Sequence, residues 1–389
     1  MIEMCFQVWA VLSAVGTIVF FLRVIWVGRS LRPLQEEDLT DLGRWPSLSV
    51  VVTARNEAEQ IESALRTLMG STYPHLELVV VNDRSEDRTG EIVDRLAEEG
   101  PVQAVHLTDL PEGWLGKVHA QARGAEVAKG DWLLFTDADV GFSSNALKRA
   151  VAFAERSQLD HLALFPDIRV GGFWAGLVLP VFGSIFLERL RLHRLEKPGS
   201  GAYVGVGAFN LVRRDSLLRS EGLAWIRMEV ADDVGLGLVL QRSGARSGLR
   251  VAREDVKVLW YPDLITMFEG LEKNLFGASC HYRFSRYLVT MFLGASFLGG
   301  LVALPFLGPA WISMGLPFLI GSALIASSVL VHQRMGTGFY YGLLFPVGFV
   351  LLASMLSRSA WACWRNQGIS WRGTRYPIGE LRANQRVKI

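Results

Sequence analysis

The sequence is short of charge, cysteine and histidine. Charged residues make up 20% of the 389 positions, below the roughly 25% of an ordinary soluble domain. The 40 basic and 38 acidic residues leave a net charge of +2, too small an excess for a nucleic-acid-binding protein. Three distant cysteines fit neither a disulfide framework nor a zinc site, and the seven histidines include no pair at metal-ligand spacing. With 50% hydrophobic residues, the chain is also too apolar for intrinsic disorder.

The apolar residues gather at the two ends of the chain. Met4–Leu22 contains no charged residue, and an apolar run of this length can cross a bilayer as a helix. Glu3 precedes the run and no A-x-A-like cleavage site follows it, which favours an uncleaved anchor over residues 1–30 rather than a secretory signal. The positive-inside rule places the domain that follows in the cytoplasm, because Arg23, Arg29 and Arg32 flank the C-terminal end of the apolar segment.

A second membrane region is expected at residues 287–357. Three runs there contain no charged residue and are each about one span long: Tyr287–Leu307, Pro309–Val331 and Phe339–Ser357. Residues 358–389 form a basic tail with seven basic residues and one acidic residue, which the same rule keeps in the cytoplasm. An even number of runs must then cross the bilayer. We expect Tyr287–Leu307 not to cross fully, since it contains three glycines and Pro305.

A shorter apolar run lies in the middle of the chain. Phe173–Leu187 has 15 residues, contains Pro180 and is followed by charged residues. It is short for a membrane span, so we predict an interfacial helix at residues 173–187. A buried core helix is the alternative.

The polar part of the chain, residues 46–280, is predicted to be an α/β domain. Short apolar strands alternate with helical patterns, which indicates a parallel sheet covered on both faces. The predicted strands are Ser47–Thr53, Leu76–Asn82 and Trp132–Thr136, and the helical patterns include Glu57–Met69 and Asp87–Glu99. A further strand is expected at Ala202–Leu211 and a helix at Val234–Leu240. Ligands of such sheets bind beyond the carboxyl ends of the strands.

Carboxylates follow three of the predicted strands at that edge. Glu57 follows the first and Asp83 the second, while Asp137 and Asp139 end the third. Glu57 could instead cap a helix, but the helix after Asp139 begins only near Asn145. Two aspartates one residue apart suit a hard divalent cation that shares its ligand shell with phosphates.

Five motifs, in this order, resemble those of the family 2 glycosyltransferases over about residues 46–280. They are Val51–Glu57 (VVTARNE), Val80–Ser85 (VVNDRS), Gly113–Ala120 (GWLGKVHA), Phe135–Asp139 (FTDAD) and Glu229–Leu236 (EVADDVGL). The resemblance implies a GT-A type nucleotide-sugar-binding domain with a mostly parallel sheet, here with transmembrane helices at both ends. The membrane arrangement is similar to that of ceramide glucosyltransferase and of the carotenoid and hopanoid glycosyltransferases.

The resemblance also implies roles for single residues in binding the donor. Three residues would line the uridine pocket, with the last of them near the ribose: Ala54, Arg55 and Glu57. Asp83 would accept a hydrogen bond from the uracil ring, and Asp137 would lie near the ribose and the sugar. Asp139 would hold Mg²⁺ or Mn²⁺ against the diphosphate. Lys117 would face the nucleotide or its phosphates, the alternative being a solvated lysine on a loop.

The acidic pair Asp232 and Asp233 would supply the catalytic base. In the family the second member, here Asp233, takes the proton from the acceptor hydroxyl as it attacks the anomeric carbon, and Asp232 stands where a glutamate is common. Such a single displacement inverts the anomeric configuration. Two adjacent carboxylates could also be a helix N-cap followed by a first-turn acid.

One family motif is missing. No Gln-x-x-Arg-Trp occurs after the acidic pair, which favours single-sugar transfer over processive synthesis. Lys273 could replace its arginine at the diphosphate, and Arg372 next to Trp371 is a second candidate.

The expected function is therefore that of an inverting, metal-dependent glycosyltransferase that moves a single sugar from a UDP-sugar to a membrane lipid hydroxyl. We expect an integral protein of a bacterial cell membrane with a cytoplasmic catalytic domain. Transfer to polyprenyl phosphate, which needs no general base, and a non-catalytic protein that binds nucleotide-sugar are the alternatives.

Overall fold

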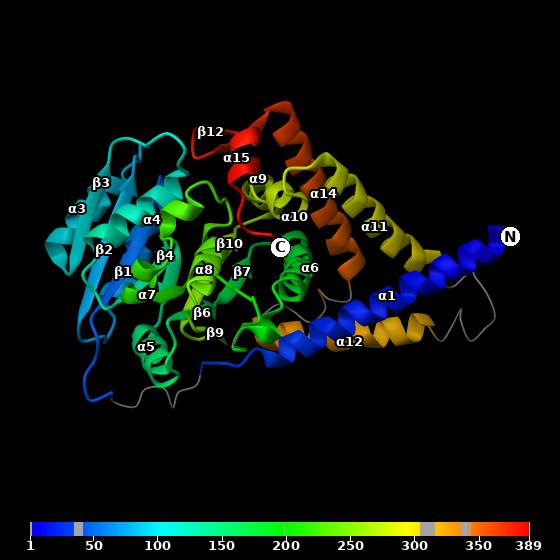
Figure 1. The fold of residues 1–389 in the computed structure, drawn as a ribbon, viewed down its shortest axis with the longest axis horizontal. Helices are drawn as coiled ribbons and strands as arrows, with labels where there is room; N and C mark the ends of the chain where they lie inside the picture. The colour runs from blue at the N-terminus through cyan, green and yellow to red at the C-terminus, as the bar shows by residue number, and fades with distance from the viewer. Residues whose placement is uncertain are drawn as a thin grey trace.

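The computed structural model describes residues 2–34, 42–197, 199–303, 316–335, 341 and 344–388. Its centre is a seven-stranded sheet in the order β3-β2-β1-β4-β8-β6-β9 (Figure 1). Neighbouring strands are parallel except at β8, which is antiparallel to β4 and β6. The strands are Val102–Leu107 (β3), Leu76–Asp83 (β2), Leu48–Ala54 (β1), Trp132–Asp137 (β4), Asn210–Arg213 (β8), His161–Phe165 (β6) and Ser247–Val251 (β9). The α/β class and the mostly parallel sheet are confirmed.

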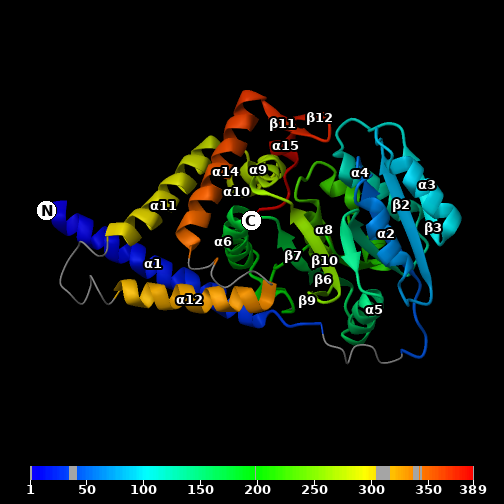
Figure 2. The same cartoon turned by 180° about the vertical axis from the view of Figure 1, so that it is seen from behind.

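Strand β1 explains why the apolar runs are nearly continuous. All of its residues are buried, and successive side chains point to opposite faces of the sheet. Val50 and Val52 pack in the cluster formed with α2 (Ile61–Met69), α3 (Thr89–Glu99) and α5 (Ala146–Arg156). Val51 packs on the other face with α4 (Gly116–Val127) and α8 (Asp232–Arg242). Helices thus cover both faces, as Figures 1 and 2 show from opposite sides.

The strand register brings the polar strand ends into line. Thr53 of β1 pairs with Asp137 of β4, and Ala54 pairs with Asn82 of β2. The chain ends of these three parallel strands therefore meet at one edge, as the sequence predicts. The prediction of a strand at Ala202–Leu211 was wrong for most of these residues, because only the last two lie in β8.

Smaller elements complete the domain. A three-stranded sheet has the order β5-β10-β7, and a hairpin pairs β11 with β12 near the C-terminus. These strands are Val140–Phe142 (β5), Asp167–Val170 (β7), Val256–Tyr261 (β10), Gly368–Trp371 (β11) and Thr374–Pro377 (β12). The remaining helices of the domain are α7 (Arg214–Arg219), α9 (Leu264–Glu272), α10 (Leu275–Cys280) and α15 (Ile378–Asn384), with short 3₁₀ helices at Leu192–Arg194 and Leu223–Ile226.

Long apolar helices gather on one side of the α/β domain, with the N-terminus at their far end (Figure 1). They are α1 (Ile2–Ser30), α6 (Phe173–Arg189), α11 (Phe284–Ala303), α12 (Leu316–Met335) and α14 (Phe345–Arg365). Helix α1 packs against α6, α11 and α12. Among the residues that the structure describes, three helical segments are long and apolar enough to cross a membrane: Met4–Ser30, Phe173–Arg194 and Phe345–Arg365. Parts of the three runs expected at residues 287–357 lie outside the described residues.

Helix α6 packs closely against α14. A Cβ atom on Gly348 of α14 would lie 2.1 Å from the carbonyl oxygen of Leu177 in α6, so only glycine allows this approach. Most of α6 is buried, while Phe173 and Trp174 at its start are 46% and 55% exposed. The helix is thus largely a packed helix with an exposed aromatic end, and its position in the headgroup region remains a prediction.

The basic tail is folded against the α/β domain. Its first residues continue α14, and the rest forms the hairpin, α15 and an extended end. The guanidinium of Arg382 donates to the carbonyl oxygen of Tyr282 at 2.5 Å. The backbone N–H groups of Arg386 and Val387 donate to the carboxylate of Glu229. The tail and the α/β domain therefore lie together, while their location on the cytoplasmic side of the membrane stays a prediction.

Candidate active site

The candidate site lies at the edge where β1, β2 and β4 end. Besides the strand ends, it is formed by the first turns of α4 and α8, by a glycine-rich loop at residues 201–207, and by the turn of the β11–β12 hairpin. Every sequence-predicted site residue lies on one of these elements or within three residues after a strand end, except Lys273 at the end of α9.

Lys117 is the cation at the centre of the site. It lies in the first turn of α4, and its side chain is only 12% exposed. Its Nζ is 2.7 Å from Oδ1 of Asp137 and 3.4 Å from Oδ2 of Asp232. Although burial opposes it, the charges of the two aspartates raise the pKa of Lys117 above its usual value. The alternative of a solvated loop lysine was therefore wrong.

One helical turn after Lys117, Gln121 contacts the carboxylate of Asp232. Its Nε2 donates to Oδ2 of Asp232 at 2.8 Å. Residues four apart share one face of a helix, so the Lys117-x-x-x-Gln121 spacing was the signal that could have identified this residue from the sequence.

The two members of the acidic pair have different surroundings. Asp232 is buried against Lys117 and Gln121. Asp233 accepts hydrogen bonds from the backbone N–H of Gly207 at 3.0 Å and from its neighbour Val234 at 2.8 Å. The N-cap position of α8 belongs to Ala231, whose methyl group cannot cap a helix. The pair does lie in the first turn of α8, but its carboxylates mainly contact other parts of the site.

Burial and the neighbouring charge of Asp232 raise the pKa of Asp233 to about 7, although Lys117 opposes the shift. A carboxyl group with a pKa near neutrality is suited to accept a proton at physiological pH.

The glycine-rich loop explains why no strand forms at Ala202–Phe209. A Cβ on Gly205 would lie 1.7 Å from the carbonyl oxygen of Asp233, so the loop backbone touches the start of α8. A Cβ on Gly207 would lie 2.8 Å from Oδ2 of Asp137 and 3.7 Å from Oδ2 of Asp233. Gly207 thus lies beside both carboxylates, and a side chain at this position would collide with Asp137.

Asp139 has the surroundings of an incomplete cation site. Its Oδ1 is buried and has no hydrogen-bond partner among the described residues. Burial and the charges of Asp137 and Glu57 raise the pKa of Asp139 to about 7. Within the described part of the chain, no group of three or more His, Cys, Asp or Glu side chains could enclose a metal. The arrangement fits a cation such as Mg²⁺, which binds one or two carboxylates and takes its other ligands from phosphates and water.

The residues expected around the nucleotide lie at the ends of β1 and β2. Ala54 is the fully buried last residue of β1. Arg55 follows it, and Nε and Nη1 of this side chain are buried without a hydrogen-bond partner in the portion of the chain described. Asp83 is fully buried and accepts from Nε and Nη2 of Arg84 at 2.7 and 3.2 Å. A Cβ on Gly116 would lie 2.6 Å from Oδ2 of Asp83, so glycine is required there too.

Glu57 is paired with a residue from the far end of the chain. Nη2 of Arg372 donates to its Oε1 at 3.1 Å across 315 positions of sequence. Burial raises the pKa of Glu57, and the charge of Arg372 opposes that shift. Since the side chain faces Arg372, it does not cap α2, whose N-cap position belongs to Gln60.

Lys273 and Arg372, the two candidates to replace the arginine of the missing Gln-x-x-Arg-Trp motif, both lie next to Trp371. The ammonium of Lys273 is 4.3 Å from the centre of the Trp371 ring, a cation–π contact, and Arg372 is the next residue of the hairpin. Burial and the positive charges of Arg372 and Lys117 lower the pKa of Lys273 to about 8. Burial and the charge of Asp139 raise the pKa of Tyr261 to about 12. No motif indicated Tyr261.

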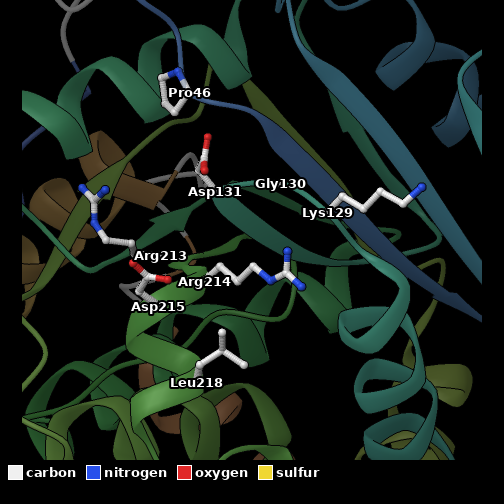
Figure 3. Close-up of a pocket in the computed structure, with 8 residues that line it drawn as sticks. All are labelled: Pro46, Lys129, Gly130, Asp131, Arg213, Arg214, Asp215 and Leu218. Atoms are coloured by element: carbon white, nitrogen blue, oxygen red, sulfur yellow. The ribbon is translucent and has the colours of Figure 1, made fainter.

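A polar pocket of about 390 Å³ lies at the opposite end of β1 and β4, away from this site (Figure 3). It is lined by Pro46, Lys129, Gly130, Asp131, Arg213, Arg214, Asp215 and Leu218. None of the predicted site residues lines it.

Comparison with known proteins finds similarity to glycosyltransferases within the α/β domain. Residues 49–219 match the family described as Glycosyl transferase family 2. The chain is 33% identical over 113 residues to 4,4'-diaponeurosporenoate glycosyltransferase of Staphylococcus haemolyticus, which is 29% of each chain. It is 26% identical over 225 residues to beta-monoglucosyldiacylglycerol synthase of Trichormus variabilis, which is 57% of this chain and 44% of the relative. The chain thus spans less than half the length of these relatives.

The fold is shared with a solved enzyme. The mannosyltransferase PcManGT from Pyrobaculum calidifontis, in complex with GDP-Man and Mn²⁺, superposes with a TM-score of 0.50 over 92% of this chain and 98% of that chain, at 18% identity. At this identity the likeness concerns the fold alone, and it confirms the expected GT-A type architecture.

Proposed function

We propose that this chain, whose residues 49–219 form a family 2 glycosyltransferase domain, transfers a single sugar from a UDP-sugar to the hydroxyl of a membrane lipid with inversion. One observation carries the proposal: Lys117 joins Asp137 of the strand edge to Asp232 of the acidic pair, with Asp233 on the other side of Gly207. Donor-binding and base-supplying groups therefore lie next to one another.

The donor nucleotide binds at the ends of β1 and β2. Ala54 and Arg55 line its base and Glu57 lies near the ribose, while buried Asp83 accepts a hydrogen bond from the uracil N–H. The two unpartnered nitrogens of Arg55, counted among the described residues, support a polar ligand at this place.

Asp139, with Asp137 beside it, would hold Mg²⁺ or Mn²⁺. A divalent cation supplies charge stabilisation to the departing diphosphate when it is bound, and the fold relative PcManGT was solved with Mn²⁺. Lys273 and Arg372 add positive charge on the hairpin side of the diphosphate. Arg372 lies at the turn that faces Glu57, and Lys273, at the end of α9, contacts the neighbouring Trp371.

Asp233 acts as the general base. It removes the proton from the acceptor hydroxyl while that oxygen attacks the anomeric carbon and the bond to the diphosphate breaks. The N–H of Gly207 holds one carboxylate oxygen. Lys117 neutralises Asp137 and Asp232, so that the negative donor can approach these carboxylates.

The acceptor is a lipid because apolar helices lie directly beside the domain. Helices α6 and α14 pack on it, and the start of α6 exposes Phe173 and Trp174. One relative is named for monoglucosyldiacylglycerol synthesis and another for a diaponeurosporenoate acceptor. We place the protein in a bacterial cell membrane, anchored by α1, with the domain in the cytoplasm because basic residues follow the anchor.

The test is sugar transfer by the full chain reconstituted in lipid vesicles. The protein is incubated with Mn²⁺ and either UDP-sugars or GDP-sugars, and extracted lipids are analysed by mass spectrometry. We expect one lipid class to gain one sugar from a UDP-sugar in wild type but not in Asp233→Asn. Asp215→Asn, the same change on an exposed aspartate at the opposite end of the sheet, should behave as wild type.

Two outcomes would contradict the proposal. Transfer from GDP-sugars alone would overturn the assigned nucleotide. Full activity of Asp233→Asn with polyprenyl phosphate would identify that acceptor instead, because an anionic phosphate needs no general base.

A further inference from the structure

The C-terminal end of the chain returns from the apolar helices to the active site. After α14 ends at Arg365, the β11–β12 hairpin, α15 and an extended end lie between those helices and the α/β domain (Figure 1). We call residues 366–388 the strap. It touches the site in two places.

The first contact is on the donor side. Arg372 and Gly373 form the hairpin turn with φ angles of 49° and 75°, a left-handed pair that reverses the chain tightly. In this turn Nη2 of Arg372 donates a hydrogen bond to Oε1 of Glu57 at 3.1 Å. The phenol oxygen of Tyr376 accepts the backbone N–H of Gly116 at 3.3 Å, one residue before Lys117. The hairpin is thus bound to both the first strand end and the start of α4.

The second contact is on the base side and centres on Glu229. This glutamate is 4% exposed and lies three residues before Asp232. Its Oε2 accepts the N–H groups of Arg386 at 2.7 Å and of Val387 at 2.9 Å, and its Oε1 accepts the N–H of Ala231 at 3.3 Å. One carboxylate therefore joins the chain end to the residue before α8.

Apolar and aromatic contacts reinforce the second contact. Val387 is buried in a cluster that includes Val204 and Val234, and the phenol of Tyr203 donates to the carbonyl oxygen of Lys388 at 3.3 Å. The end of the strap thus packs against both the glycine-rich loop and α8, the two elements that hold Asp233.

Burial of Glu229 requires these bonds. Desolvation raises its pKa, and the backbone N–H donors of Val387, Arg386 and Ala231 oppose the shift. A buried carboxylate deprived of its donors is strongly destabilised, so loss of the chain end must change the conformation around Glu229.

We propose that the strap is part of the active site and that Glu229 is a positioning residue, which uses the chain end to hold the start of α8 and thereby Asp233. The catalytic consequence rests on the proposed function. Neither the buried acid nor the chain end takes a direct part in sugar transfer.

The test compares Glu229→Gln, a chain that ends at Asn384, and wild type in vesicles. We expect kcat to fall about ten- to a hundredfold, the range expected when a reacting group is misplaced by about 1 Å. The KM for the UDP-sugar should change less than about twofold, because Glu57, Asp83 and Asp139 keep their surroundings. Glu221→Gln is the matched control, since that glutamate is exposed and paired with Arg242 at 2.9 Å; it should retain wild-type kinetics.

Hydrogen–deuterium exchange gives a readout that does not need a donor. In both variants residues 229–236 should lose protection while β1, β2 and β4 remain protected, which also shows that the domain is folded. Unchanged protection of residues 229–236, or wild-type kcat in both variants, overturns the proposal. If wild type transfers no sugar at all, the proposed function fails, while exchange alone still decides whether the strap holds α8.

Discussion

The two halves of the active site are built in different ways. In the donor half, residues 48–139, the candidate groups other than Lys117 lie at or just after the ends of β1, β2 and β4, and parallel register aligns those ends. In the base half, Asp233 is held by Gly207 across 26 positions, and Glu229 by Arg386 across 157. A local pattern is therefore sufficient to predict the first half, whereas the second depends on a loop and a chain end that only packing brings together.

The largest effect is expected from a substitution in the donor half. Asp139→Ala should abolish turnover, because it removes the carboxylate that would hold the cation while leaving core packing intact. Sugar transfer is measured with Mg²⁺ or Mn²⁺ in reconstituted vesicles, and excess Mn²⁺ should not restore it fully. Asp215→Ala is the matched control on the surface. Wild-type rates in Asp139→Ala, or wild-type activity that chelators leave unchanged, would show that no metal acts there.

The next largest effect is expected from a substitution in the base half that leaves donor binding intact. Asp233→Asn keeps the shape of the side chain and loses its basicity, so kcat should fall by about 10²–10⁴-fold. Binding of the UDP-sugar, measured by calorimetry, should stay within about twofold of wild type. An equal loss of donor affinity would mean that Asp233 is a structural residue of α8.

The dependence of kcat on pH tests the role of Asp233 in the base half separately from donor binding. Burial and Asp232 raise the pKa of Asp233 to about 7, and a base acts only when it is deprotonated. The rate kcat should therefore fall about tenfold per pH unit below 7 and level off above it. In Asp233→Asn this fall of kcat below pH 7 should disappear. If the variant shows the same fall, the titrating group is a residue other than Asp233.

Lys117 links the two halves, so its replacement should affect both. Lys117→Met leaves Asp137 and Asp232 without their shared cation. We expect a loss of folding stability at the lower end of about 3–5 kcal/mol, because Asp137 is 37% exposed and partly solvated. Thermal unfolding and donor binding are the measurements, with Lys129→Met as the exposed control. Unchanged stability and donor affinity would remove Lys117 from the site.

The smallest effect concerns the position of the strap. A cysteine at position 385, with Cys5 replaced by serine, should resist an impermeant reagent applied to the outer face of sealed vesicles and react after permeabilisation. The reason is that the strap and the α/β domain are in contact, so both lie on one side. Labelling from outside in right-side-out vesicles would contradict a cytoplasmic domain.

Several parts of the structure could be predicted from the sequence because they depend on local pattern. β1, β2 and β4 occur within one residue of their expected limits, and the helix after the acidic pair begins two residues before Val234. The expected strand at Ala202–Leu211 failed for a physical reason. Its β-branched residues have the right propensity, but Gly205 and Gly207 have to approach Asp233 and Asp137 more closely than a strand with side chains permits.

Sequence patterns alone predict the α/β domain, the apolar helices at both ends and the carboxylates at the strand ends, because strand periodicity, run length and parallel register are properties of short segments. The packed fold is needed to see that Lys117 bridges Asp137 and Asp232, that Arg372 contacts Glu57, and that the chain end binds Glu229. These contacts join residues that are up to 315 positions apart. Their partners are selected by burial and charge compensation after the elements have packed, and no spacing along the chain encodes them.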